Sequence, residues 1–280
     1  MSDRKNFFES LEPKSALVVG LVGGVLVLCT IGFFVMLGIS LSKTSTFGIG
    51  NKANTTATAD PTQNDVAPAP TPVVTKSDRP KVELFVMSYC PYGLQMEKAY
   101  LPVMELLKNK ADLSIKYVSY AMHGKKEIDE NTRQVCINKQ YPDKFLPYMK
   151  CFVGEDNYQK CLGVAGVNEA NLTSCMGATD KQFAITANFN DQSKWLSGRY
   201  PIYAVNADLN EKYGVQGSPT LVINGAEANA DRTPEGVKRT VCAAFNNAPE
   251  ECKTVLGTGS FGAGFGLSAG ANTGGAECAT

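Results

Sequence analysis

The sequence of 280 residues has little that would attract nucleic acid or hold a metal ion. Lysine and arginine number 27, and so do aspartate and glutamate, so the formal net charge is zero. Without excess positive charge there is no general attraction to phosphate, and we expect no nucleic-acid partner. His123 is the only histidine, and no cysteine pair has the spacing Cys-x2-Cys, so we expect no metal site and no cofactor. We favour a structural or solvent-facing role for His123 over an acid–base role.

Cysteine, in contrast, is plentiful, with nine residues. Cys29 lies in an apolar run, and the other eight cysteines follow it. That number is high for a protein of the reducing cytosol and ordinary for an exported domain. We therefore expect the part of the chain that follows the apolar run to lie in an oxidising compartment.

The apolar run at residues 16–42 contains no charged side chain and lies between Lys14 and Lys43. A helix needs about 20 apolar residues to cross the hydrocarbon core, and this run is longer. A cleavable signal peptide is the alternative, but its apolar region is usually about 7–15 residues long. We predict one transmembrane helix that stays as an anchor. Positively charged residues flank both ends of the run, so charge does not set its orientation. The cysteines after the run indicate an oxidising compartment on that side, which places residues 1–15 in the cytoplasm.

Two segments have the composition of unfolded chain. Residues 43–78 are rich in threonine, alanine and proline, which indicates an extended linker between membrane and domain. Residues 258–280 are rich in glycine, whose ordering is entropically costly, and we predict a disordered tail. The folded domain is then expected at residues 79–257.

Within this domain, apolar and branched residues predict strands, and apolar residues at helical spacing predict helices. The order is strand, helix, strand, helical insert, strand, strand, helix, which is a mixed α/β fold with a helical insertion. The expected strands are residues 81–88, 113–120, 221–225 and 227–230, and the expected helices are one from Pro91, the insert at about 131–189, then 208–213 and 233–246.

Short motifs at four places in the domain are informative together. They are Ser-Tyr-Cys-Pro-Tyr-Gly at 88–93, Met-His-Gly-Lys-Lys-Glu at 122–127, Gly-Ser-Pro-Thr at 217–220, and the pair Cys242 and Cys252 near the end.

Over about residues 81–252 the chain resembles the gamma-interferon-inducible lysosomal thiol reductase family and, more broadly, DsbA-like thioredoxin-fold oxidoreductases. The resemblance implies a thioredoxin-like fold with Cys90 as the redox-active cysteine. The sequence departs from the family at Gly93, where the second cysteine of Cys-x-x-Cys is absent. It departs again at Ala121 and Ile128, where the two cysteines of a family motif are absent together, as the loss of one disulfide would produce.

Six further cysteines are expected to form structural disulfides, as is usual in exported domains. Four lie in the helical insert, and four cysteines allow three pairings, which sequence alone does not distinguish. The pairs we favour are Cys151–Cys161, which closes a short loop, Cys136–Cys175, which clamps the insert, and Cys242–Cys252, which ties the last helix to the segment after it.

Cys90 stands before Pro91 at the start of a predicted helix. Helix N-termini favour negative charge, and thiols placed there have lowered pKa values, so Cys90 is a candidate nucleophile that forms mixed disulfides. With Gly93 in place of a second cysteine, the other thiol must come from a small molecule, the substrate or Cys278. The alternatives are that Cys90 is redox-inert, or that it is bridged to a cysteine of the insert.

The resemblance also implies a proline loop opposite Cys90, with Pro219 in the cis form and assigned with Cys90 to the catalytic site. Its purpose would be to expose the Ser218 backbone to an extended substrate. Tyr92, Ser218 and Thr220 are then the candidate substrate-binding residues.

The sequence thus favours a membrane-anchored thiol–disulfide oxidoreductase or isomerase that uses one nucleophilic cysteine. Its expected partners are exported thiols or disulfides and a redox partner in the membrane. A redox-inactive binding module on a membrane stalk is the alternative. A third hypothesis is a surface protein that is cross-linked through Cys278.

Overall fold

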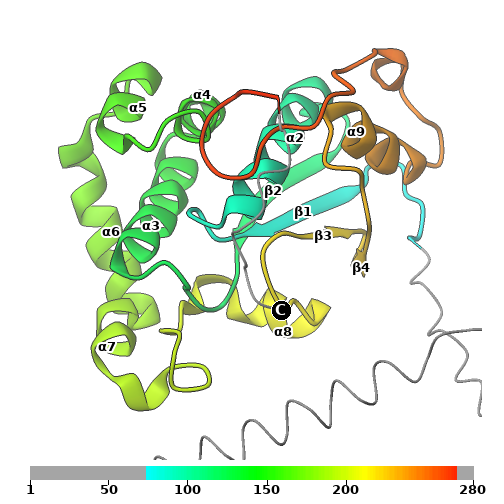
Figure 1. Ribbon diagram of the computed structural model, residues 1–280. Coiled ribbons are helices and arrows are strands. Elements are labelled where there is room, and N and C mark those ends of the chain that lie inside the picture. The colour runs from blue at the N-terminus through cyan, green and yellow to red at the C-terminus, as the bar shows by residue number, and fades with distance from the viewer. Residues whose placement is uncertain (1–73, 270–280) are drawn as a thin grey trace, which may run out of the picture. The chain divides into compact units, whose positions relative to one another are not determined.

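The computed structural model describes residues 74–269, and a four-stranded sheet lies at the centre of this region (Figure 1). The strand order is β2-β1-β3-β4. β1 (Lys81–Val86) pairs in parallel with β2 (Asp112–Tyr117) and antiparallel with β3 (Thr220–Ile223). β4 (Ala226–Glu227) pairs antiparallel with β3. The first half of the fold is therefore a parallel strand–helix–strand unit, and the second half is a hairpin.

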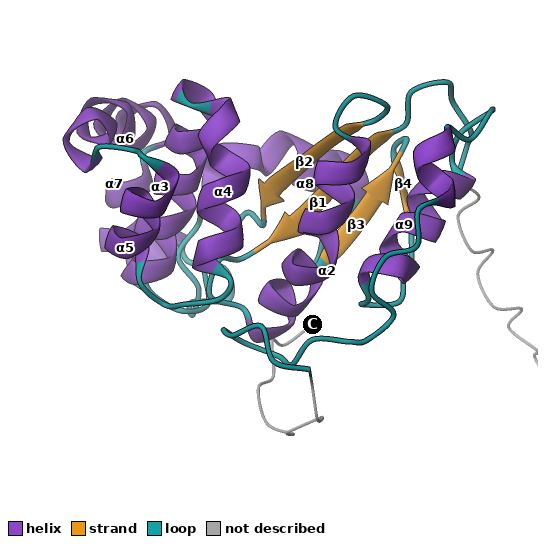
Figure 2. Ribbon diagram, turned by 90° about the horizontal axis from the view of Figure 1, so that it is seen from above, coloured by secondary structure: helices purple, strands orange, loops and turns teal. Residues whose placement is uncertain are grey.

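Helices cover both faces of the sheet. α2 (Pro91–Leu107) and α9 (Pro234–Ala243) lie on one face, and α8 (Ala207–Tyr213) lies on the other (Figures 1 and 2). This arrangement with the strand order above is a thioredoxin-like α/β fold, and it confirms the fold class predicted from the sequence.

The alternation of side chains along β1 explains the two covered faces. Leu84 and Val86 point into the larger apolar cluster with residues of α2 and α9. Phe85 and Met87 point the other way, into a second cluster that also contains Cys90. Because successive residues of a strand face opposite sides, the apolar residues at 84–87 bury β1 on both of its faces.

A helical insert extends the domain at one end of the sheet (Figure 1). Two disulfides, Cys136–Cys175 and Cys151–Cys161, join its helices, and both pairings agree with those favoured from the sequence. The insert begins six residues earlier than expected, at Lys125 instead of about residue 131. Its helices are α3 (Lys125–Gln140), α4 (Pro142–Phe152), α5 (Tyr158–Ala165), α6 (Glu169–Phe183) and α7 (Ile185–Asn190).

The remaining short elements connect the insert to the second half of the fold and finish the domain. Cys242–Cys252 ties α9 to the turn that follows it, as expected. The short helices of the 3-10 type are η2 (Gln192–Lys194), η3 (Ala204–Asn206) and η4 (Glu250–Lys253).

The start of the domain lies slightly before the predicted boundary at residue 79. Ser77 pairs with the end of α9, where its N–H donates to the Ala244 carbonyl at 2.9 Å. The Asn246 N–H donates to the Ser77 carbonyl, also at 2.9 Å. The last residues of the predicted linker are therefore part of the fold.

The prediction of a disordered tail is wrong for residues 258–269. This stretch packs against α2 and α4, and Phe261 forms an antiparallel bridge with Ala269 (Figure 1). Glycine content suggested that ordering would be too costly, but buried contacts described below offset that cost. Residues 270–280 lie outside the part of the chain that the structure describes.

No helix within residues 74–269 is long and apolar enough to cross a membrane. The anchor predicted at 16–42 and most of the predicted linker lie outside the described residues.

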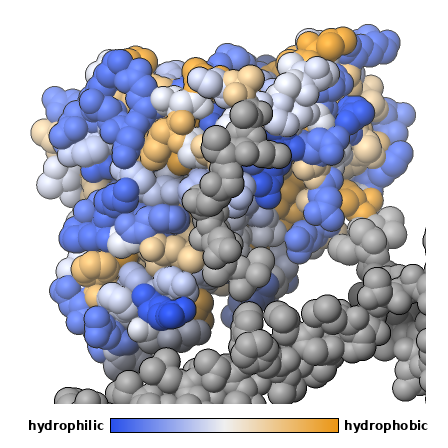
Figure 3. Space-filling model, in the orientation of Figure 1, coloured by the Kyte–Doolittle hydropathy of each residue, from blue (hydrophilic) through white to orange (hydrophobic). Residues whose placement is uncertain are grey.

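The surface of the described domain is mixed in polarity. On the face drawn in Figure 3, apolar residues lie in small separate patches among hydrophilic ones. Within residues 74–269 the exposed large apolar side chains are far apart in sequence, at Val164, Leu196, Val255 and Leu267.

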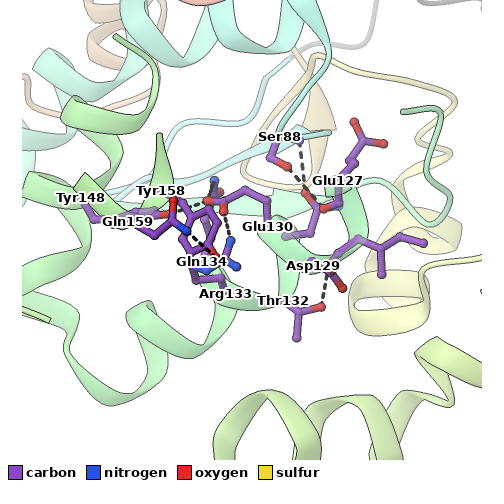
Figure 4. Close-up of polar contacts among 12 residues, drawn as sticks. Ser88, Glu127, Asp129, Glu130, Thr132, Arg133, Gln134, Tyr148, Tyr158 and Gln159 are labelled. Atoms are coloured by element: carbon purple, nitrogen blue, oxygen red, sulfur yellow. Dashed lines mark hydrogen bonds and ion pairs between the residues drawn. The ribbon is translucent and has the colours of Figure 1, made fainter. Parts of the chain in front are cut away.

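Two carboxyl groups are buried where α2 meets the helical insert. They belong to Glu97 of α2 and Glu130 of α3. Glu130 accepts hydrogen bonds from Arg133, from Gln134 Nε2 at 2.8 Å and from the Tyr148 hydroxyl at 2.6 Å (Figure 4). Within the described residues, neither carboxyl oxygen of Glu97 has a hydrogen-bond partner. Burial raises the pKa of Glu97 well above its ordinary value of 4.5, and the nearby charge of Glu130 raises it further.

We predict that Glu97→Gln stabilises the protein in a pH-dependent way. As the pH rises past 4.5, the unfolded chain loses this proton first, so the wild type loses about 1.4 kcal/mol per pH unit until the folded-state pKa is reached. Glutamine never ionises, so the variant should match the wild type near pH 4 and exceed it by at least about 1 kcal/mol at pH 7. Urea unfolding at both pH values measures this difference.

The matched control is Glu105→Gln, which changes an exposed carboxylate of the same helix that is paired with Lys150. Exposed ion pairs contribute about 0–1 kcal/mol, so this variant should show no comparable gain with pH. An equal effect of Glu97→Gln at pH 4 and pH 7 would show that the carboxyl group is not held neutral.

Candidate active site at Cys90

Cys90 is the N-cap of α2, with extended backbone and Pro91 at the first helical position. The Gly93 N–H donates to Cys90 Sγ at 3.4 Å. The unpaired N–H groups and the dipole of a helix favour negative charge at this end. A thiolate released at this position is therefore stabilised by a donor that is already in place.

Cys90 is buried, and its sulfur takes part in a disulfide. The other six cysteines within residues 74–269 are bonded to one another in three pairs. The alternative that Cys90 is bridged to a cysteine of the insert is therefore excluded. In this structure the candidate nucleophile is not a thiol, because its sulfur is held in the oxidised form.

The proline loop lies against Cys90, and the Ser218–Pro219 bond is cis, as the resemblance implies. The Ser218 carbonyl oxygen lies 3.4 Å from Cys90 Sγ. The Ser218 hydroxyl accepts a hydrogen bond from the Met87 N–H at 3.0 Å. The loop is thus fastened to the end of β1, immediately before the turn that presents Cys90.

The other two candidate substrate-binding residues lie beside this loop. Thr220 begins β3, and its hydroxyl donates to the Gly217 carbonyl at 2.9 Å. Tyr92 is half-buried against the Cys90 cluster, and the Arg232 guanidinium lies 5.1 Å from the centre of its ring. Arg232 also lines a small pocket with Pro219 and Thr220. Sequence reasoning did not single out Arg232, because the chain brings it here from a position far along the sequence.

Gly93 occupies the place of the missing second cysteine, and a side chain there would collide with the Ser218 hydroxyl as it stands. A Cβ built on Gly93 would lie 2.6 Å from Ser218 Oγ and 3.2 Å from the Met87 carbonyl oxygen. The Ser218 hydroxyl therefore takes the space in which a side chain at 93 would begin. A resolving thiol for Cys90 has to approach from elsewhere.

Glu127, in the Met-His-Gly-Lys-Lys-Glu motif, holds the turn before Cys90. Its buried carboxylate accepts from the backbone N–H groups of Met122 at 2.8 Å, His123 at 3.3 Å and Tyr89 at 3.3 Å. His123 Nδ1 lies 2.5 Å from the same carboxylate, which gives this histidine a structural role. One side chain thus joins two loops, and Figure 4 shows its helix beside Ser88.

Asn131 adds to this support from the same helix. Its Oδ1 accepts from the Ser88 N–H at 3.1 Å, and the Ser88 hydroxyl donates to the Glu127 carbonyl at 3.4 Å. The motif at 122–127 served in the sequence only as a sign of family resemblance. It did not predict that Glu127 and Asn131 would bind the backbone around Cys90. A glutamate four residues after the only histidine was the available signal.

Ala121 and Ile128, which stand where the family has two cysteines, are both buried in the larger apolar cluster. At these positions the chain has apolar packing in place of sulfur. Within residues 74–269, no three His, Cys, Asp or Glu side chains gather as a metal site requires.

No protein-family model matches the chain, and no curated protein matches it. Solved structures with a similar fold include reduced DsbA from Mycobacterium tuberculosis, with a TM-score of 0.44 at 14% identity, covering 64% of this chain and 94% of that chain. Reduced DsbG from the same organism has a TM-score of 0.44 at 14% identity and covers 64% and 89%. Oxidised BdbD from Bacillus subtilis has a TM-score of 0.40 at 20% identity and covers 66% and 94%. Such low values assign no function, so the role of Cys90 must follow from its own surroundings.

We predict that Gly93 and Ser218 are energetically coupled. Gly93→Ala should force the Ser218 hydroxyl away from the Met87 N–H, and leaving that donor unsatisfied costs about 1–3 kcal/mol. The helix propensity of alanine offsets up to about 1 kcal/mol. In a Ser218→Ala background the hydrogen bond is already lost, so Gly93→Ala should cost at least about 1 kcal/mol less. A double-mutant cycle of unfolding free energies measures the coupling, and additivity within about 0.5 kcal/mol would contradict it.

We also predict that Glu127→Gln destabilises the turn at Cys90. The amide turns an NH2 group toward backbone donors and leaves a buried N–H group unsatisfied, at a cost of about 1–3 kcal/mol. The control is Asp129→Asn in the same helix, where an exposed ion pair with Lys125 should contribute less than about 1 kcal/mol. Unfolding free energies of the two variants give the comparison, and equal losses would rule out a special role for Glu127.

Proposed function

We propose that this chain is a thiol–disulfide oxidoreductase that acts through Cys90. The observation that carries the proposal is a disulfide-bonded sulfur at a helix N-terminus, 3.4 Å from the carbonyl of a cis-proline loop. The sulfur of a disulfide is electrophilic, and the helix end supplies stabilisation for the thiolate that leaves.

The exchange takes place in two steps. A client thiolate attacks Cys90 Sγ, the existing bond of Cys90 breaks, and the sulfur previously bonded to Cys90 leaves as a thiolate. A second client thiolate then attacks the client sulfur of the mixed disulfide and releases Cys90 as a thiolate beside the Gly93 N–H. The client loses two electrons, and the protein disulfide gains them and becomes two thiols.

The client is an exported protein or peptide with cysteine residues. An extended client segment would run along the loop at Ser218 and Pro219, where backbone hydrogen bonds give affinity without fixing a sequence. Tyr92 and Thr220 flank this path, and the Arg232 guanidinium near Tyr92 adds a positive charge beside it. We propose these residues as the substrate-binding set.

The proposed setting is a membrane surface. Residues 16–42 would span the bilayer once, with the N-terminus in the cytoplasm and the domain outside. The three structural disulfides of the domain support an oxidising compartment, where such bonds persist. A redox partner within the membrane would reoxidise the domain.

The test is single-turnover oxidation of a reduced peptide with two cysteines by the oxidised full-length chain. The expected result is about one peptide disulfide formed per protein molecule, as counted by alkylation and mass spectrometry. Cys90→Ser should form none, since the attacked sulfur is gone. A peptide with a single cysteine should form a transient mixed disulfide, which acid quenching traps and whose protein half maps to Cys90.

The matched control is the pair Cys151→Ala and Cys161→Ala, which removes a structural disulfide of the insert and leaves Cys90 unchanged. This control should oxidise the peptide as the wild type does. Equal inactivity of the wild type and Cys90→Ser, with the peptide still bound by both, would instead indicate the redox-inactive binding module.

A further inference from the structure

The glycine-rich segment 261–269, here called the strap, is fastened to the helix that begins at Cys90. The ammonium of Lys98 donates to three strap carbonyls, those of Gly262 at 2.7 Å, Gly264 at 2.7 Å and Gly266 at 2.8 Å. Lys98 is buried, and its ammonium also lies 5.8 Å from the centre of the Phe261 ring. A buried cation needs such compensation, so the strap and Lys98 stabilise each other.

Further hydrogen bonds set the position of the strap along α2 and α4. Gln95 Nε2 donates to the Phe261 carbonyl at 2.7 Å. The Gly264 N–H donates to the carbonyl of Pro91, the residue after Cys90, at 2.9 Å. The Gly266 N–H donates to the Val153 carbonyl at 3.0 Å. The strap therefore passes directly beside the first turn of the active-site helix, as the red segment of Figure 1 shows.

An aromatic contact adds to this attachment. The Phe265 ring lies 5.5 Å from the Tyr89 ring and 5.3 Å from the Phe152 ring, both in edge-to-face geometry. Tyr89 is the residue before Cys90. Gly264 and Gly266 have φ values of +78° and +101°, which side-chain-bearing residues rarely adopt, so this path requires glycine.

The strap ends close to the active site, with a cysteine a short distance further along the chain. Ala269 pairs with Phe261, whose carbonyl is held by Gln95, five residues after Cys90 on the same helix. Cys278 follows Ala269 by nine residues, a stretch that reaches up to about 30 Å when extended. One helical turn is about 5.4 Å long, so Cys90 lies well within this reach.

We propose that Cys278 is the resolving thiol of Cys90 and that the strap delivers it to the active site. The proposal rests on the exchange activity proposed above and names the second sulfur that Gly93 cannot supply. Cys29 is the other cysteine outside the described residues, and it lies within the apolar run expected to be in the membrane.

The chemistry balances within one chain. In the oxidising direction, a client thiolate attacks Cys90, the Cys90–Cys278 bond breaks, and Cys278 leaves as a thiolate. In the reducing direction, the Cys278 thiolate attacks Cys90 Sγ in a mixed disulfide, and the client sulfur leaves as a thiolate. The two protein thiols then carry two electrons fewer and form the internal disulfide.

The direct test is a peptide map of the wild-type full-length chain under non-reducing conditions. We expect one cross-linked peptide pair containing Cys90 and Cys278, in protein that migrates as a monomer. Cys90 bonded to Cys29, or dimers that disappear in Cys278→Ser, would overturn the proposal. This measurement needs no variant to fold.

The functional test uses Cys278→Ser in the peptide oxidation assay. The variant should oxidise no two-cysteine peptide in a single turnover, because it cannot hold the internal disulfide. Once loaded with a single-cysteine peptide, it should keep the mixed disulfide that the wild type resolves. If Cys278→Ser oxidises the peptide as well as the wild type while Cys90→Ser is inactive, the resolving role fails and the proposed function stands.

The role of the strap is tested by Lys98→Met, which removes the charge bound by the three carbonyls and leaves both cysteines in place. Without docking of the strap, the last fixed residue before Cys278 is Gly257, whose carbonyl accepts from the Glu235 N–H at 3.0 Å. Undocking thus lengthens the free chain before Cys278 from nine residues to about twenty-one, and effective concentration falls roughly as the −3/2 power of length.

We expect glutathione to open the internal disulfide of Lys98→Met at least about threefold more readily than that of the wild type. The control Lys108→Met removes an exposed lysine just after the same helix and should behave as the wild type does. An unchanged glutathione equilibrium in Lys98→Met would overturn the role of the strap.

Discussion

The close approach of the Ser218–Pro219 loop to the first turn of α2 is the constraint on which the arrangement around Cys90 depends. The Ser218 hydroxyl bonds the Met87 N–H and fills the space beside Gly93, while the Ser218 carbonyl lies against the sulfur. These contacts fix the backbone on both sides of Cys90, and a side chain at position 93 would have to displace the Ser218 hydroxyl. The first turn of the active-site helix therefore carries one sulfur, and a second thiol for exchange has to come from outside this turn.

Two buried side chains, Glu127 and Lys98, stabilise the irregular backbone near this sulfur. The Glu127 carboxylate accepts hydrogen bonds from backbone N–H groups of the turn before Cys90 and of the loop at Met122 and His123. The Lys98 ammonium donates hydrogen bonds to carbonyl oxygens of the strap. In each case a charged side chain satisfies backbone that belongs to no helix or strand, which is how irregular segments remain ordered when they are buried.

Much of the fold could be predicted from the sequence because its signals are local. Runs rich in apolar and branched residues identified β1 and β3, and short spacings indicated the pairs Cys151–Cys161 and Cys242–Cys252. The strap could not be predicted, since its glycine content indicates a high ordering cost, and its anchor at Lys98 lies more than 160 residues earlier in the chain. The space filled by Ser218 beside Gly93 was hidden for the same reason, because only the folded loop brings the two residues together.

The spacing of the strap glycines has a consequence for how the C-terminal region can vary. Gly262, Gly264 and Gly266 alternate along the chain, and their three carbonyls converge on one ammonium. Inserting or deleting a single residue among them would turn a peptide dipole away from Lys98. A change in length after Ala269 would leave this anchor in place and alter only the reach of the chain to Cys278.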